Sequence, residues 1–150
     1  MPKFKIIDKG EIISYFEREF GMEREIFENY VFLSSGKKIW MVEKESWEKI
    51  RDNLEKINVQ SIGIAIARIG RVVKPTSNFL QIFGKYAKRK IVGLDEKEAL
   101  DYIRGLDIKK DCREKGYVIV KFGKDVLGCG LAKEGWIKNQ IPKARRVKKL

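Results

Sequence analysis

Hydrophobic and polar positions in the first part of the chain repeat with two different periods. In GEIISYFEREFG the apolar side chains recur every three or four residues, which predicts a helix that ends at Gly21. The segment ENYVFLSSGKKIWMVEK predicts two strands joined by a turn at SSGKK. A second apolar stripe predicts a helix from Ser46 to Ile57. The two stripes consist of Ile12, Ile13, Phe16 and Phe20, and of Trp47, Ile50, Leu54 and Ile57.

The later part of the chain mainly predicts strands, with short helices between them. VQSIGIAIARIGRVV, IVGL, GYVIVKF, VLGCGLA and GWIKNQIP have strand-like patterns, and GKD between two of them indicates a hairpin. Pro75 followed by Thr76 or Ser77 is a helix-start signal. Asp95 and Glu98 have the spacing of a capping box, at the start of the helix DEKEALDYIRG. The predicted fold class is therefore α+β.

Charge divides the chain into the same two parts. Residues 1–60 carry 11 basic and 12 acidic side chains, a net charge of −1, whereas residues 61–150 carry 22 and 9, a net charge of +13. We therefore predict a small α+β domain over 1–60 and a mainly β domain over 61–150. The short join at 58–62 favours packing of the two on each other. The basic excess favours a polyanionic partner for the second domain, the alternative being a merely solubilising surface.

The chemistry of the sequence argues against catalysis. The chain has no histidine and only two cysteines, which excludes an ordinary zinc site and a Ser-His or Cys-His catalytic pair. Cys129 lies in an apolar strand and is expected to be buried, while Cys112 is expected in a loop. The glycines of GCGLAKEG lie inside a predicted strand and not before a helix, so they favour close packing over cofactor binding. We expect a protein that is not an enzyme, with no catalytic residues, metal or cofactor; helix capping accounts for the acidic residues Asp95, Glu96, Glu98 and Asp101.

Other features of the sequence concern the cellular location of the protein and the kind of organism it comes from. No apolar run reaches the roughly 18 to 20 residues that span a membrane, and charges interrupt the apolar pairs of MPKFKIIDKGEII, unlike a signal peptide. We expect a cytoplasmic protein with no membrane partner. A composition rich in Lys and Glu and poor in Gln is typical of thermophiles.

Basic residues interleaved with aromatic ones form the candidate binding surface. Cations neutralise phosphates, and an aromatic ring can stack on unpaired bases. For Tyr86, core packing is favoured over stacking, and for Trp136 both remain open. Asn139 could read a base or cap a turn, and the turn is favoured. Only Val147 to Leu150 should fray. The predicted RNA-binding residues are Lys74, Lys85, Lys88, Arg89, Lys90, Trp136, Lys138, Asn139, Lys143, Arg145 and Arg146.

Several motifs together resemble a known RNA-binding domain. The strings GR…KPTSNF, YIRG, GYVIVKFGKDVLGCGLAK and IKNQIPKARR resemble the PUA-like C-terminal domain of Fmu/Sun-type rRNA cytosine-5 methyltransferases, over roughly residues 68–146. Ala144 stands where those relatives favour glycine. The matching positions are Gly70, Pro75, Ser77, Tyr102, Arg104, Gly105, Gly128, Lys138, Asn139, Pro142, Lys143 and Arg145.

The whole chain is also similar to the Nip-seven-like ribosome-biogenesis factors, in which a pre-PUA unit precedes a PUA domain. YVFLSSGKKIWMVEK resembles the pre-PUA hairpin, and GKYAKRKIVGL the start of the PUA fold. These resemblances imply a mixed β pseudo-barrel with short helices that binds RNA, either rRNA or pre-rRNA or else tRNA, in ribosome biogenesis or rRNA maturation. The methyltransferase domain and its S-adenosylmethionine and Pro-Cys motifs are missing from the sequence, so only the RNA-binding module is expected.

Two alternatives remain open for the function. The chain could be an RNA-binding subunit that completes an rRNA or tRNA cytosine-5 methyltransferase in trans. It could instead be a protein-interaction adaptor that docks a protein partner through its near-neutral residues 1–60.

Overall fold

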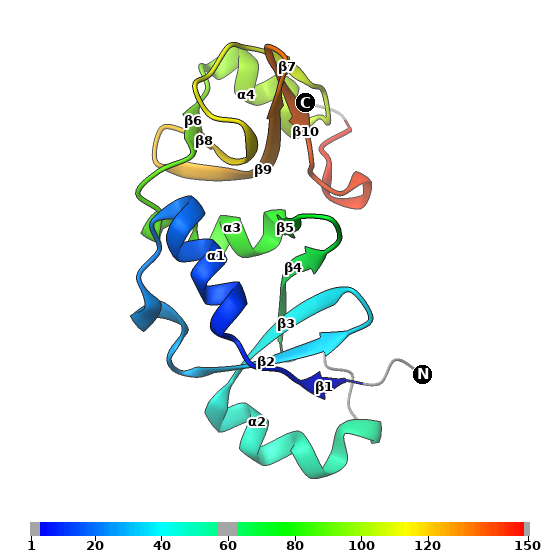
Figure 1. Ribbon diagram of the computed structural model, residues 1–150. Coiled ribbons are helices and arrows are strands. Elements are labelled where there is room, and N and C mark those ends of the chain that lie inside the picture. Colours follow the sequence, from blue (N-terminus) through cyan, green and yellow to red (C-terminus); the bar gives the residue numbers. More distant parts are fainter. Residues whose placement is uncertain (1–3, 57–62, 149–150) are drawn as a thin grey trace. The chain divides into compact units, whose positions relative to one another are not determined.

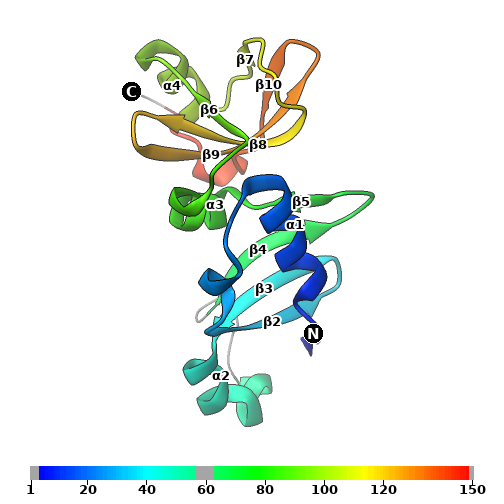
Figure 2. The ribbon, with the colours of Figure 1, turned by 60° about the vertical axis from the view of Figure 1, so that its left-hand side comes forward.

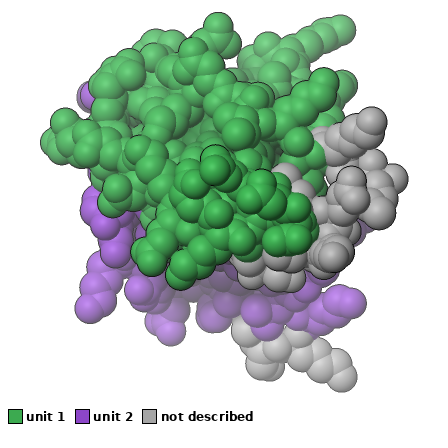
Figure 3. Space-filling model, turned by 90° about the horizontal axis from the view of Figure 1, so that it is seen from below, with its two compact units in different colours: residues 1–74 green, residues 75–150 purple. Residues whose placement is uncertain are grey.

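The computed structural model describes residues 4–56 and 63–148. Its chain forms two compact units, residues 1–74 and 75–150, which Figure 3 colours separately. The predicted join at 58–62 lies outside the described residues, as do the side chains of Leu54 and Ile57 in the predicted second helix. No helix in the described part of the chain is long and apolar enough to cross a membrane. The α+β fold class predicted from the sequence is confirmed.

The first unit is an antiparallel sheet with helices on its two faces (Figures 1 and 2). The predicted hairpin is present as β2 and β3, which pair from Tyr30–Glu43 to Ser35–Lys38. Its strands follow the order β1 (Lys5–Ile6), β2 (Tyr30–Ser35), β3 (Lys38–Glu43), β4 (Ile64–Ile69) and β5 (Val73–Pro75), and its helices are α1 (Gly10–Phe20), η1 (Arg24–Phe27), α2 (Lys44–Ile50) and η2 (Arg51–Lys56).

Alternate residues of the hairpin point to opposite faces of the sheet, and both faces are buried. On one face, the ring of Phe16 in α1 lies 5.8 Å from Phe27, and Phe27 lies 5.9 Å from Phe32 of β2. On the other face, Trp47 of α2 joins a cluster with Leu33, Trp40 and Val42. The helix predicted from the first apolar stripe is present, and it ends at Gly21 in the left-handed conformation. Residues of one strand thus supply two separate apolar layers, as the period of two requires.

The two compact units divide later in the chain than the sequence predicted. Strand β4, which we had assigned to the second domain, pairs with β3 and so extends the sheet of the first unit. The division therefore falls between Lys74 and Pro75, and not between residues 60 and 61. An apolar strand pattern shows that a segment pairs, but it does not show with which strand.

The second unit is a mixed, half-barrel sheet. Its strands follow the order β6 (Ile91–Gly93), β8 (Gly116–Phe122), β9 (Asp125–Lys133), β10 (Trp136–Asn139) and β7 (Ile108–Lys109). Strand β6 is parallel to β8, and the other pairs are antiparallel. The predicted hairpin around GKD is confirmed as β8 and β9, and the predicted last strand as β10.

Two short helices cover the faces of this second sheet. Helix α4 (Glu96–Ile103) packs on the face formed by Val118, Val120 and Ile137. It begins with the predicted capping box, in which the Glu98 amide donates to Asp95 and the Asp95 amide donates to Glu98. Helix α3 (Ser77–Phe83), capped by Thr76, continues into η4 (Gly84–Tyr86) and packs on β9 on the other face.

The predicted close packing around the β9 glycines is present. A Cβ atom at Gly130 would lie 2.6 Å from Ile137 and 2.9 Å from Val120, so no side chain fits there. The hydroxyl of Tyr102 in α4 donates to the carbonyl of Cys129, which is fully buried as predicted. Burial raises the pKa of that hydroxyl, which keeps it protonated as a donor. These residues hold α4 on the sheet.

Candidate nucleic-acid interface

The side chain of Asn139 organises the turn that follows β10. Its Oδ1 accepts from the Ile141 amide at 2.9 Å, and its Nδ2 donates to the carbonyls of Tyr102 at 2.7 Å and Leu106 at 3.0 Å. Its backbone amide donates to Asp107 at 2.8 Å. Both ends of the side-chain amide are engaged within the fold, so Asn139 caps the turn. The sequence favoured this role over the reading of a base.

Arg146 also has a role within the fold. Its Nε donates to the Ile141 carbonyl at 3.0 Å, and its side chain lies over Gly105, where a Cβ atom would come within 2.4 Å of the arginine Cδ. Gly105 has a φ of +100°, which favours glycine as well. The next amide, of Val147, donates to the carbonyl of Ile103 at 2.9 Å, so the chain is bonded to α4 at the residue where we predicted fraying to begin. Arg146 is therefore engaged within the fold.

Arg145 and Lys143 lie on the 3₁₀ turn η5 (Lys143–Arg145) and are exposed. The Arg145 guanidinium donates to the side-chain oxygen of Gln81 in α3 at 2.5 Å. Gln81 in turn donates to the Leu127 carbonyl of β9 at 2.8 Å. The guanidinium is thus held against α3 while other donors of its fork remain for a phosphate.

Trp136 lies among lysines on one face of the sheet. Its cross-strand partners are Lys133 on β9 and Lys109 on β7, and cross-strand partners point to the same face. Lys138, two residues further along β10, shares that face, with its Nζ 5.4 Å from the Trp136 ring centre and 3.7 Å from Asp107. Trp136 is 38% exposed, so core packing does not account for it. This arrangement combines an accessible ring with three cations.

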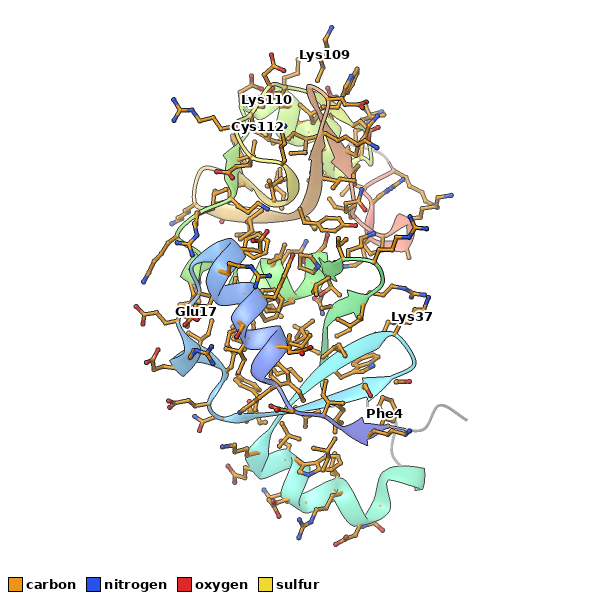
Figure 4. The ribbon with its side chains drawn as sticks, viewed as in Figure 1. Phe4, Glu17, Lys37, Lys109, Lys110 and Cys112 are labelled. Carbon is orange, nitrogen blue, oxygen red and sulfur yellow. The ribbon has the colours of Figure 1, made fainter. Side chains whose placement is uncertain are left out.

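A cleft of about 500 Å³ adjoins Trp136. Such a volume falls within the roughly 300–1,000 Å³ of pockets that hold small molecules. Lys110, which lines it, is paired with Glu98 at 3.1 Å, and Figure 4 labels Lys109, Lys110 and Cys112 in this region. Its lining consists of Lys110, Cys112, Glu114, Lys115, Gly116, Leu131, Ala132, Lys133, Glu134, Gly135 and Trp136.

The remaining predicted residues fall in two places. Lys85, Lys88 and Arg89 are exposed in and after η4, and the Lys85 Nζ lies 5.2 Å from the Tyr86 ring centre. Lys90 has a φ of +60°, and its carbonyl accepts from the Ile119 amide, so its backbone serves the sheet. Lys74 lies in β5 and belongs to the first unit, whereas the other predicted residues belong to the second.

The predicted RNA-binding residues did not include Lys109, Lys110, Lys115 and Lys133. Lys133 could have been found, because it mirrors Trp136 across the short turn between β9 and β10. Lys109 could not, because only the pairing of β7 with β10 brings it beside Trp136.

A comparison with protein families supports the resemblance drawn from the motifs. Residues 89–147, about two fifths of the chain, match the family model for the methyltransferase RsmF PUA domain. This segment is therefore a PUA domain of the RsmF methyltransferase type, a kind of domain that typically binds RNA. A search among curated proteins finds no match to the chain.

Proposed function

We propose that this protein binds RNA through its second unit and takes part in rRNA maturation without being an enzyme itself. The observation that carries the proposal is Trp136, an exposed ring bordered by Lys109, Lys133 and Lys138 and by a cleft, within a PUA domain. Unpaired bases stack on exposed aromatic rings, while lysines neutralise the neighbouring phosphates. The same surface suits a single-stranded or looped segment better than a regular duplex, whose bases are already stacked.

The charge of the second unit supports an RNA partner. Residues 75–150 carry 19 basic and 9 acidic side chains, a net charge of +10. The exposed cations of η5 and of residues 85–89 add to those around Trp136. The choice of rRNA or pre-rRNA over tRNA rests on the resemblance to rRNA methyltransferases and ribosome-biogenesis factors.

A second candidate is an RNA-binding subunit of a methyltransferase that acts in trans. The observation in its favour is that residues 89–147 match a domain of the RsmF methyltransferase. Incubated alone with rRNA and labelled S-adenosylmethionine, the chain is expected to transfer no methyl group. If the purified chain alone transferred a methyl group, the proposed non-enzymatic role would be wrong.

Binding is tested by titrating labelled single-stranded RNA at several salt concentrations. If about four to six phosphates are neutralised, log affinity should fall with log salt with a slope of about −3 to −4. Trp136→Ala should weaken binding by about tenfold, since stacking contributes about 1–3 kcal/mol per base.

Tyr86→Ala is the matched control, because Tyr86 is an exposed aromatic of the same unit that also lies beside a lysine. Its affinity should stay within about twofold of the parent's. Absence of binding, or binding indifferent to salt, would contradict the proposed function. An equal loss in both variants would show that the loss is not specific to stacking on Trp136.

A further inference from the structure

One end of the first sheet gathers five basic residues that are dispersed in the sequence. We call this surface the basic end; it consists of Lys37, Lys38, Arg68, Arg71 and Lys74. Lys37 lies in the turn between β2 and β3, and Arg71 lies in the turn between β4 and β5. The two turns are adjacent, because the Ile69 amide donates to the Lys37 carbonyl at 2.7 Å. Folding therefore joins cations from both sides of the predicted domain boundary.

The basic end has a defined geometry. Lys38 and Arg68 are cross-strand partners, so their side chains leave the same face. The Lys38 Nζ lies 5.2 Å from the ring centre of buried Trp40, which fixes its position. Lys74 lies on β5, the next strand after β4. Three neighbouring strands, about 4.8 Å apart, spread these charges over about 10 Å.

The acidic residue of β3 lies far from the basic end. Glu43 is at the opposite end of β3, five residues from Lys38 and hence about 16 Å away. Figure 4 shows Glu17 and Lys37 on opposite sides of the unit. Ion pairs of the first unit join Arg18, Arg24, Lys49 and Arg51 to glutamates, and none among the described residues includes a member of the basic end. The unit is therefore polarised although its net charge is small.

We propose that the basic end binds the phosphate backbone of RNA, as a second contact surface of this protein; the inference rests on the proposed RNA-binding function. Lysine offers a point charge and arginine a forked donor, and both suit phosphate oxygens. The indole of Trp40, beside Lys38, is buried, so this surface offers mainly charge. Binding here is consequently independent of base sequence.

The test removes three exposed charges from the full chain. The variant carries Lys37→Gln, Arg68→Gln and Arg71→Gln and spares Lys38, which packs on Trp40. Losing three single-strand phosphate contacts should lower the salt slope by about 2 and the affinity by about 100-fold at 0.1 M salt. The matched control carries Lys44→Gln, Lys49→Gln and Arg51→Gln, which remove three exposed charges of the same unit in and after α2. Its affinity should stay within about threefold of the parent's.

The outcomes separate this inference from the proposed function. A parent chain that does not bind RNA overturns both. A parent that binds, with a basic-end variant that binds equally well, overturns the inference alone. An equal loss in the control would show a general charge effect and no local surface. Binding of the parent to phosphatidylserine vesicles, lost in the variant while RNA affinity is kept, would assign the surface to lipid instead.

Discussion

The two units carry basic charge in different ways. The first has 14 basic and 12 acidic side chains and the second has 19 and 9, net charges of +2 and +10. In the first unit the numbers of basic and acidic side chains are nearly equal. The basic end is nevertheless at the turn of the hairpin, and Glu43 is at the opposite end of the hairpin. In the second unit the excess is spread over η5, residues 85–89 and the lysines near Trp136. The net charge of a sequence segment therefore identifies a unit that is basic overall. It does not identify a unit in which basic and acidic side chains are nearly equally frequent but several basic ones gather at one end.

The units also differ in what their distinctive residues do. In the second unit, the positions that carry the family resemblance mostly build the fold. Ser77 accepts from the Cys129 amide at 2.9 Å, Tyr102 donates to the same residue's carbonyl, and Asn139 caps a turn. In the first unit the proposed contact residues lie in turns and at strand ends, where exposed charges contribute little to stability. Substitutions at these positions of the second unit should therefore lower stability. Substitutions in the basic end of the first unit should lower RNA affinity and leave stability nearly unchanged.

The largest effect is expected at Gly130, where the second sheet is most tightly packed. Gly130→Val would place a side chain 2.6 Å from Ile137, and overpacking of this kind should cost about 3 kcal/mol. The melting temperature of the unit should fall by about 10 °C or more, measured by circular dichroism. Gly93→Val is the control, because no atom lies within 4 Å of the added Cβ on β6. Equal melting of the two variants would contradict this account of the packing.

A smaller effect is expected at Asn139. Asn139→Ala removes three hydrogen bonds and should lower the free energy of unfolding by about 2 kcal/mol. Asn139→Asp keeps the acceptor for Ile141 but turns a carboxylate toward two carbonyls, so it should destabilise at least as much. At a temperature where each variant is folded, RNA affinity should remain within about twofold of the parent's. A tenfold loss of affinity with unchanged melting would instead make Asn139 an RNA contact.

Much of the fold could be predicted because its signals are local. The capping box of Asp95 and Glu98, the two hairpins and the end of α1 at Gly21 each depend on residues close in sequence. The pairing of β4 with the first sheet and of β7 with β10 depends on distant residues, and a strand pattern does not specify its partner. The same reason explains why Lys109 beside Trp136, and the gathering of the other cations of the basic end with Lys74, were not visible in the sequence.

The smallest expected effect compares two neighbours, Arg145 and Arg146. Arg145 is exposed and contacts α3 through Gln81, so Arg145→Gln should leave the melting temperature within about 2 °C of the parent's. Its RNA affinity should fall about fivefold at 0.1 M salt, the effect of one lost phosphate contact. Arg146→Gln should show the reverse, because its side chain packs over Gly105 and bonds to Ile141. It should melt several degrees lower and bind RNA nearly as well as the parent does. Both variants lose one positive charge from adjacent positions, so each controls for the other. Equal losses of affinity would show that the charge of this segment acts collectively and that the separation of roles between these two arginines is wrong.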